Sequence, residues 1–261
     1  MEYSQSSASA CKWWVMLFDD DRIRYGRQIK YPGFGEEGQK KLKAAHVAVL
    51  GVGGLGCAAS VYLAYAGIGN ITIVDNDSVE LSNLNRQILH WEQDIEERKT
   101  ASAARKLSSI NSSIKITPVC DSITKENVRG IIKGADVVID GLDNFKTRFI
   151  VNAACVKAGV PFIHAGVSGM LGEITTIIPR KTPCLACIYP ALSDGKEVIP
   201  VFGASPALMA SLQVMEAIKL IAGFGKTLAG RMLYFDGETM EFFIEDLVRD
   251  PHCKVCGARS K

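Results

Sequence analysis

Residues 47–56 read Val-Ala-Val-Leu-Gly-Val-Gly-Gly-Leu-Gly, an apolar run that leads directly into a glycine-rich turn. The apolar part is typical of a buried strand, and residues 55–66 have the spacing and small side chains of a closely packed helix. Gly51, Gly53 and Gly56 fit Gly-x-Gly-x-x-Gly, in which glycines let backbone N–H groups at a helix N-terminus approach phosphate. This stretch therefore predicts a strand, turn and helix that bind a nucleotide phosphate, with a tight turn that binds no ligand as the alternative.

Beyond this unit, apolar runs alternate with helical stretches, which is the pattern of a parallel sheet with crossover helices. The sequence thus predicts an α/β fold with a Rossmann-like, mostly parallel sheet. The expected strands of this part are residues 47–50, 71–74, 114–119, 137–139 and 161–165, and the expected helices are residues 55–66, 99–110, 125–133 and 145–158.

The pattern changes after Gly166. Residues 173–178 are rich in threonine and isoleucine, which favours an antiparallel extension of the sheet. Residues 205–221 have the apolar spacing of an amphipathic helix, and strands are expected at residues 232–236 and 241–244. We therefore expect the sheet to continue beyond its parallel part.

The chain divides into a short N-terminal segment and one domain. Residues 1–21 lack a cationic leader and a small-residue cleavage site, so we expect a flexible N-terminal tail on a cytoplasmic protein. We expect residues 22–261 to form one domain. Its nucleotide-binding half would lie at about residues 45–166 and its second half at about residues 167–257.

Composition excludes some partners. The formal charge is +2, from 30 basic and 28 acidic side chains spread along the chain, so no strong field exists to gather nucleic acid or anionic lipid. No apolar run approaches the roughly 20 residues that a membrane-spanning helix needs. We therefore expect neither a nucleic-acid nor a membrane partner.

Four of the eight cysteines form two Cys-x-x-Cys pairs, Cys184/Cys187 and Cys253/Cys256. Four thiolates around tetrahedral Zn²⁺ leave no open coordination position, so this pattern predicts a structural zinc site. A redox-active Cys-x-x-Cys motif and a set of inert buried thiols are the alternatives.

Charged side chains near the expected strand ends bear on the choice of nucleotide. Asp75 follows the second strand and is placed to bind ribose hydroxyls, which NAD and ATP share. Arg86 and Lys99 supply positive charge suited to a triphosphate, although each could be an ordinary surface cation. Asp143 and Asn144 follow another strand, where a carboxylate beside phosphates can hold Mg²⁺. The alternative is that Asp143 caps the next helix.

The four histidines lack partners at an interpretable spacing. No carboxylate or cysteine accompanies His46, His90 or His164, and His252 adjoins a cysteine pair that already completes four ligands. We therefore assign all four histidines a structural role.

These features in this order resemble the ThiF/MoeB/HesA family, the bacterial and archaeal relatives of the ubiquitin-activating enzymes. Length and layout are most similar to the molybdopterin-synthase adenylyltransferases (MoeB), and the ThiF enzymes of thiamine biosynthesis are also similar. The resemblance extends over about residues 22–257. It is carried by residues 24–29 (Arg-Tyr-Gly-Arg-Gln-Ile), the glycine turn, residues 82–87 (Ser-Asn-Leu-Asn-Arg-Gln), Lys99, Asp143, Asn144 and both cysteine pairs.

The resemblance implies ATP-dependent adenylation of the C-terminal glycine of a ubiquitin-like sulfur-carrier protein, MoaD- or ThiS-like with a Gly-Gly end. Pyrophosphate would be released, for molybdopterin or thiamine biosynthesis. The second half of the domain would bind the carrier and the zinc, through the four paired cysteines. Arg27 resembles the residue that family members extend across a homodimer interface to the partner's phosphates. The ATP and Mg²⁺ site would be lined by Gly54, Asp75, Ser82, Asn83, Arg86, Lys99, Asp143 and Asn144.

The chemistry of this reaction needs no general base. A C-terminal carboxyl has a pKa of about 3.3–3.7, so it is already ionised at neutral pH. We therefore expect Arg86, Lys99 and Arg27 to stabilise phosphate charge and Asp143 to hold the metal. No cysteine occurs in residues 188–220, where many relatives have one, so we expect the acyl-adenylate as product and a separate protein as sulfur donor.

Three other functions compete with this hypothesis. The glycine turn with Asp75 would also suit an NAD-dependent oxidoreductase. The missing loop cysteine would suit a zinc-stapled scaffold that binds nucleotide without turning it over. The tRNA-modifying branch of the same superfamily has no basic surface to support it here.

Overall fold

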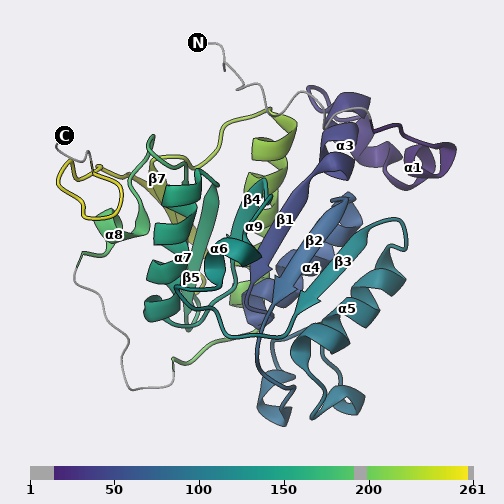
Figure 1. The fold of residues 1–261 in the computed structure, drawn as a ribbon, viewed down its shortest axis with the longest axis horizontal. Helices are drawn as coiled ribbons and strands as arrows, with labels where there is room; N and C mark the ends of the chain where they lie inside the picture. Colours follow the sequence, from purple (N-terminus) through teal and green to yellow (C-terminus); the bar gives the residue numbers. More distant parts are fainter. Residues whose placement is uncertain (1–14, 191–198, 258–261) are drawn as a thin grey trace.

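An eight-stranded sheet forms the centre of the computed structural model, which describes residues 15–190 and 199–257 (Figure 1). The strand order is β3-β2-β1-β4-β5-β6-β7-β8. The strands are β1 (His46–Leu50), β2 (Asn70–Val74), β3 (Lys115–Val119), β4 (Val137–Asp140), β5 (Phe162–Ser168), β6 (Leu171–Ile177), β7 (Arg231–Asp236) and β8 (Glu241–Asp246).

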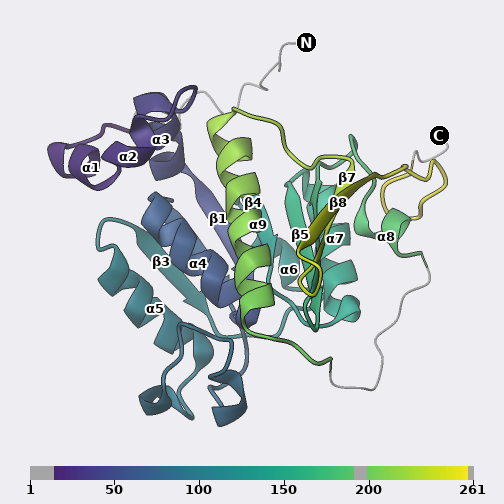
Figure 2. The same ribbon diagram turned by 180° about the vertical axis from the view of Figure 1, so that it is seen from behind.

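Helices cover both faces of the parallel part of the sheet, as Figures 1 and 2 show from opposite sides. Val47 and Val49 of β1 pack with α4, α5 and α9, whereas Ala48 and Leu50 pack with α6 and α7. Burial on both faces explains why this strand is an uninterrupted apolar run. The helices are α1 (Asp19–Arg24), α2 (Gly26–Ile29), α3 (Gly35–Ala44), α4 (Gly54–Ala66), α5 (Lys99–Ile110), α6 (Val128–Ile131), α7 (Phe145–Ala158), α8 (Leu185–Ile188) and α9 (Ala204–Ala222), with short 3₁₀ helices η1 (Leu81–Asn83) and η2 (Glu92–Asp94).

The sheet has a parallel part and an antiparallel part, as predicted. Strands β1 to β5 pair in parallel, and β6, β7 and β8 join β5 through antiparallel pairing. Strand β1 lies between β2 and β4, so the direction of strand progression reverses beside it. In open α/β sheets, ligands bind at the carboxyl ends of the strands at such a switch point. The α/β fold with an antiparallel extension is confirmed.

Helices α2, α3 and α8 were not among the expected elements, and two further differences concern α6 and α1. The helix expected at residues 125–133 is limited to α6, because Thr124 and Asn127 exchange side-chain hydrogen bonds with each other's backbone N–H groups and form a turn ahead of it. Helix α1 begins at Asp19, ahead of the boundary expected after residue 21, and the buried Asp21 pairs with Lys43 of α3 at 2.6 Å. Residues 1–14 lie outside the described residues.

Within residues 15–190 and 199–257, no helix is both long enough and apolar enough to cross a membrane.

Candidate nucleotide site and cysteine cluster

The glycines of the turn between β1 and α4 are required for different reasons. Gly51 has φ of 93°, in the left-handed region, and a Cβ on it would lie 2.4 Å from the carbonyl oxygen of Gly141. A Cβ on Gly56 would lie 1.8 Å from the carbonyl oxygen of Gly51. Within 4 Å, by contrast, a Cβ on Gly53 would meet among the described residues only the Gln87 amide nitrogen, at 3.9 Å. Gly53 thus has open space beside it, which suits the approach of a ligand.

The start of α4 offers backbone N–H groups to a ligand. The N–H groups of residues 53–56 donate no hydrogen bond to an acceptor in the described part of the chain. The N–H of Val52, in contrast, donates to Asp75 Oδ2 at 2.8 Å, and Asp77 donates its N–H to Asp75 Oδ1 at 2.9 Å. Free N–H groups and the positive end of the helix dipole together favour an anion here. Asp75, half-buried at the end of β2, fixes the turn and keeps further lone pairs for a ligand.

Arg86 and Lys99 approach this turn from the connection between β2 and α5. A Cβ on Gly54 would lie 3.6 Å from Arg86 Cγ, so the arginine stem adjoins the glycine turn. The Arg86 guanidinium donates to the Ser82 carbonyl oxygen at 2.8 Å. Lys99 opens α5, is only 6% exposed, and pairs through Nζ with Asp77 Oδ2 at 3.0 Å. The structure therefore places the Arg86 stem against the turn and connects Lys99 to it indirectly, through Asp77 and Asp75.

Ser82 and Asn83 form the short helix η1 that precedes Arg86. The N–H of Glu80 donates to Asn83 Oδ1 at 3.2 Å, and the Asn83 amide donates to Ser82 Oγ at 3.3 Å. The Ser82 side chain is exposed, whereas Asn83 is buried. Asn83 therefore shapes this connection, and Ser82, whose hydroxyl donates to Glu80 at 3.2 Å, lies on its exposed side.

Asp143 and Asn144 lie on the other side of the turn, after β4. Thr147 donates its N–H to Asn144 Oδ1 at 2.9 Å, so Asn144 caps α7, and the alternative of a cap by Asp143 is wrong. Asp143 is exposed, and its Oδ1 accepts a hydrogen bond from the Asn144 amide at 3.1 Å. Its loop follows Gly141, whose backbone packs against Gly51. A carboxylate at this edge of the sheet is a suitable oxygen ligand for Mg²⁺.

Arg27 lies away from the turn. It is on α2, whose Gln28 donates to the carbonyl oxygen of Ala66 at 2.9 Å. Ala66 ends α4, whereas the glycine turn begins it. Arg27 lines a cavity of about 210 Å³ together with Tyr31 and Phe34. One chain therefore does not bring Arg27 to the other predicted site residues.

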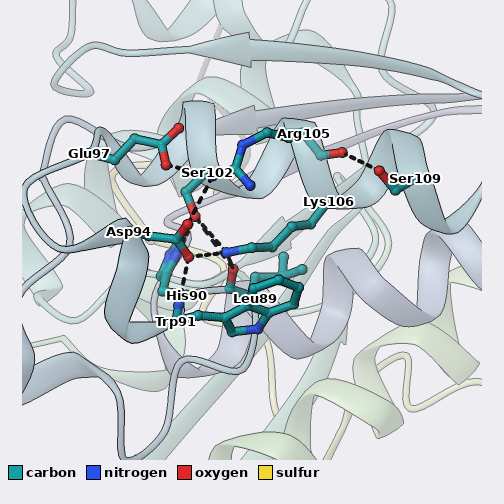
Figure 3. A network of polar contacts seen from close by, with 9 residues as sticks. All are labelled: Leu89, His90, Trp91, Asp94, Glu97, Ser102, Arg105, Lys106 and Ser109. Atoms are coloured by element: carbon teal, nitrogen blue, oxygen red, sulfur yellow. Dashed lines mark hydrogen bonds and ion pairs between the residues drawn. The ribbon is translucent and has the colours of Figure 1, made fainter.

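A buried cluster of charges holds the connection that carries Arg86 (Figure 3). Lys106 of α5 bonds to Asp94 and lies 4.2 Å from the centre of the Trp91 ring. Arg105 also donates to Asp94, at 2.9 Å. Burial would raise the pKa of Asp94, but hydrogen bonds from Lys106 and Arg105 hold it well below its usual range. This cluster was not predicted from the sequence; the available signal was Lys106, which falls beside Ala103 and Leu107 on the buried face of α5.

A second buried cluster lies beneath the Asp143 loop. His164 Nδ1 lies 2.6 Å from Asp140 Oδ2, and Arg148 Nε lies 3.1 Å from the same oxygen. Asp140 Oδ1 accepts the N–H of Leu142 at 3.0 Å, and Arg148 donates to the Leu142 carbonyl oxygen at 2.6 Å. Glu173 lies 3.6 Å from His164 Nε2. Burial disfavours a charged His164, but the hydrogen bond to Asp140 and the nearby Glu173 carboxylate outweigh it and raise its pKa.

The two cysteine pairs meet at the far end of the sheet, as predicted. The sulfur atoms of all four lie within 4.8 Å of one another. Burial raises the pKa of Cys187 to about 11. Burial also opposes ionisation of Cys253, but backbone N–H groups of Cys256 and Val255 outweigh it and lower its pKa to about 7. Four convergent sulfur ligands are the donor set that Zn²⁺ prefers in structural sites.

This fold and this arrangement of residues have counterparts among known proteins. The ThiF family matches residues 25–256, which is nearly all of the described chain. The chain belongs to the ThiF family. The resemblance inferred from the sequence is thereby confirmed.

Individual relatives of this ThiF-family chain match over most of their length. It is 41% identical to the protein HesA, heterocyst, of Trichormus variabilis, over 93% of this chain and 91% of that protein. It is 40% identical to the molybdopterin-synthase adenylyltransferase of Escherichia coli, over 92% of this chain and 98% of that enzyme. The crystal structure of E. coli MccB with ATP is similar with a TM-score of 0.79 at 29% identity, over 90% of this chain and 73% of that one.

Proposed function

We propose that this protein uses ATP to adenylate the C-terminal glycine of a ubiquitin-like sulfur-carrier protein and releases pyrophosphate. The observation that carries the proposal is the set of free N–H groups at the start of α4, bordered by Arg86 on one side and the Asp143 loop on the other. This arrangement offers donors and positive charge to phosphates, and attack by an already ionised carboxylate requires no general base. A relative named molybdopterin-synthase adenylyltransferase supports the same activity, and molybdopterin rather than thiamine biosynthesis as its pathway.

In the proposed reaction, the ionised carboxylate of the carrier attacks the α-phosphorus of ATP. A bond forms between a carboxylate oxygen and that phosphorus, and the bond from phosphorus to the bridging oxygen of pyrophosphate breaks. The residues of this chain position the reactants and stabilise the leaving charge, with Arg86 and Lys99 as the cations. Asp143 would hold Mg²⁺, which neutralises phosphate charge when bound. Gly51, Gly53, Gly54 and Gly56 would border the phosphates, with Asp75 beside the ribose.

A second copy of the chain would complete the site with Arg27. A surface groove of about 400 Å³ lies between α4 and α9, close to the Arg27 helix. Its lining includes Tyr62, Tyr65 and Met215, which are 49%, 57% and 51% exposed. Large apolar side chains grouped in this way favour burial against another protein surface. A homodimer through this face is therefore our proposed assembly.

The carrier would dock on the antiparallel end of the sheet. Strand β8 is the edge strand, and Phe242, Phe243 and Ile244 on it are each more than half exposed. An exposed edge with large apolar side chains suits a protein partner that has a sheet of its own.

We further propose that the four cysteines hold a structural Zn²⁺ that stabilises this end of the sheet. Because residues 188–220 contain no cysteine, the product would be the acyl-adenylate, and another protein would donate the sulfur.

The test is exchange of labelled pyrophosphate into ATP with purified protein, Mg²⁺ and Gly-Gly-ended carriers. We expect carrier-dependent exchange that falls roughly 100-fold in Arg86→Ala and Lys99→Ala, because each removes charge stabilisation. The matched control is Arg129→Ala, an exposed cation on α6. Absence of exchange with every such carrier, or thermal stabilisation by NAD and not by Mg-ATP, would overturn the proposal.

A further inference from the structure

One side chain outside the predicted site binds the backbone of the glycine turn. His90 is 3% exposed, and its Nε2 lies 3.2 Å from the carbonyl oxygen of Val52. The Cys57 thiol also donates to this oxygen, at 3.2 Å. A carbonyl oxygen only accepts hydrogen bonds, so His90 Nε2 must carry a proton.

The other ring nitrogen has the opposite role. His90 Nδ1 lies 3.0 Å from Ser102 Oγ, and Lys106 Nζ lies 3.0 Å from the same oxygen (Figure 3). An ammonium group only donates hydrogen bonds, so Lys106 donates to Ser102 Oγ and the Ser102 hydroxyl proton points to another acceptor. His90 Nδ1, at 3.0 Å from Ser102 Oγ, is a closer acceptor than the Leu89 carbonyl oxygen at 3.5 Å. The contacts thus favour one neutral tautomer, with its proton on Nε2.

The surroundings keep the ring neutral. Lys99 and Lys106 face it from α5, and Asp94 faces it from η2 but pairs with Lys106. Burial, together with the two lysines, lowers the pKa of His90. A protonated ring would place a second donor against the Ser102 hydroxyl and a third positive charge in the cluster.

The position of the Val52 carbonyl determines where the next N–H points. In a planar trans peptide the C=O and the following N–H point in opposite directions. The Val52 carbonyl points inward to His90, so the N–H of Gly53 points away from the interior. Gly53 is also the turn residue with open space beside it. The N–H of Val52 is held separately by Asp75. The peptide groups before and after Val52 are therefore both fixed by hydrogen bonds.

We propose that His90 is a positioning residue of the nucleotide site: as the neutral Nε2–H tautomer it holds the Val52 carbonyl inward and directs the Gly53 N–H toward the phosphates of ATP. The inference rests on the proposed function, because it takes ATP as the ligand. His90 touches neither substrate nor reacting atoms in this scheme. It acts through the backbone of the turn.

The first test measures Mg-ATP binding and the steady-state exchange reaction in His90→Leu and His90→Gln. Leucine removes one of the two side-chain donors to the Val52 carbonyl oxygen, and we expect the dissociation constant and KM for Mg-ATP to rise about tenfold, which is of the order expected for the loss of one buried hydrogen bond. Glutamine can present an N–H at the place of Nε2 and should restore binding to within about threefold. His46→Leu and His46→Gln are the matched controls. His46 begins β1, at the end away from the glycine turn, and its ring bonds to Thr72 of β2. Binding by His90→Leu within about twofold of the His46→Leu control would overturn the inference.

A second measurement does not depend on whether these variants fold. Nitrogen-15 chemical shifts of His90 in the wild-type chain report which ring nitrogen carries the proton. We expect Nε2–H near pH 7, and an Nδ1–H or doubly protonated ring would overturn the inference. Ser102→Ala removes the partner of Nδ1, so it should populate both tautomers and weaken Mg-ATP binding about two- to threefold. A wild-type chain that binds no ATP would defeat the proposed function, whereas the tautomer result concerns His90 alone.

Discussion

Two buried histidines flank the glycine turn, and the chain places them in opposite electrostatic surroundings. His90 lies among the lysines of α5, and its pKa is lowered. His164 lies between Asp140 and Glu173, and its pKa is raised. Both are 3% exposed or less. The pKa of the same side chain is therefore shifted in opposite directions on the two sides of the turn, because the charges of its neighbours outweigh what burial alone would do to His164.

The two clusters fix different backbone segments of the proposed site. The His90 cluster holds the Val52 carbonyl and the connection that carries Arg86. The His164 cluster holds Leu142 through both its N–H and its carbonyl oxygen, and Asp143 is the next residue. Each wall of the site is thus supported by its own buried ion pair, which makes the two sides separately testable.

Removal of the proposed zinc should have the largest effect and should act on one side only. Structural Zn²⁺ sites contribute on the order of 10–16 kcal/mol of apparent binding free energy. Tyr189, just after Cys187, donates to Glu173 at 2.5 Å and so links the cysteine cluster to the His164 side. We expect a strong chelator to lower Tm and to increase amide hydrogen exchange in α8 and β6 while α5 stays protected. Equal loss of protection in α5 would contradict the separation of the two sides.

Much of this arrangement could be predicted from the sequence, because it depends on local pattern. Helix α5 begins and ends at the expected residues, and β1 and α4 follow directly from the apolar run and the glycine turn. The cysteine cluster was predictable because Zn²⁺ ligand spacing is itself a pattern.

The histidine clusters could not be predicted, since their partners come from distant segments. The partner of His90 is 38 residues away and that of His164 is 24 residues away. No local period encodes such a pairing, so the structural role assigned to both residues leaves out their hydrogen-bond partners. Arg27 presents a related difficulty, because its place in the proposed site depends on a second copy of the chain.

Loss of the buried carboxylates should have the next largest effect. Asp140→Asn leaves Arg148 and His164 without their anion, and removal of one partner from a buried pair typically lowers the free energy of unfolding by about 3–5 kcal/mol. Asp94→Asn should destabilise the chain less, because one of its two cations, Arg105, has a side chain that is 50% exposed. Urea unfolding at neutral pH measures both differences. The exposed Asp246→Asn on β8 is the control, and a larger loss for Asp94→Asn than for Asp140→Asn would reverse our ranking.

The two histidines should shift stability with pH in opposite directions. The pKa of His164 is raised in the folded chain. His164 therefore contributes stability that is fully present below its unfolded-state pKa of about 6.5 and is lost as pH rises through its folded-state pKa. The pKa of His90 is lowered in the folded chain. His90 therefore contributes stability that is fully present above its unfolded-state pKa of about 6.5 and is lost as pH falls through its folded-state pKa.

Unfolding free energies of His164→Gln and His90→Gln, each compared with the wild type between about pH 5 and pH 9, measure these contributions. The deficit of His164→Gln should shrink as pH rises, and that of His90→Gln should shrink as pH falls, each by on the order of 1 kcal/mol. Parallel curves for the two variants would show that the histidines share one charge state.

The smallest expected effect concerns the outer end of the His164 cluster. Tyr189→Phe removes only the hydroxyl that donates to Glu173. The Glu173 side chain is 25% exposed, so water can replace this donor, and we expect a loss of about 0.5–1 kcal/mol in the free energy of unfolding. Tyr31→Phe is the matched control, because the Tyr31 side chain is 61% exposed and lies outside the proposed dimer groove, and it should change little. A loss as large as that of Asp140→Asn would mean that water does not reach Glu173 and that the Tyr189 hydroxyl is as important to the His164 cluster as the buried ion pair of Asp140.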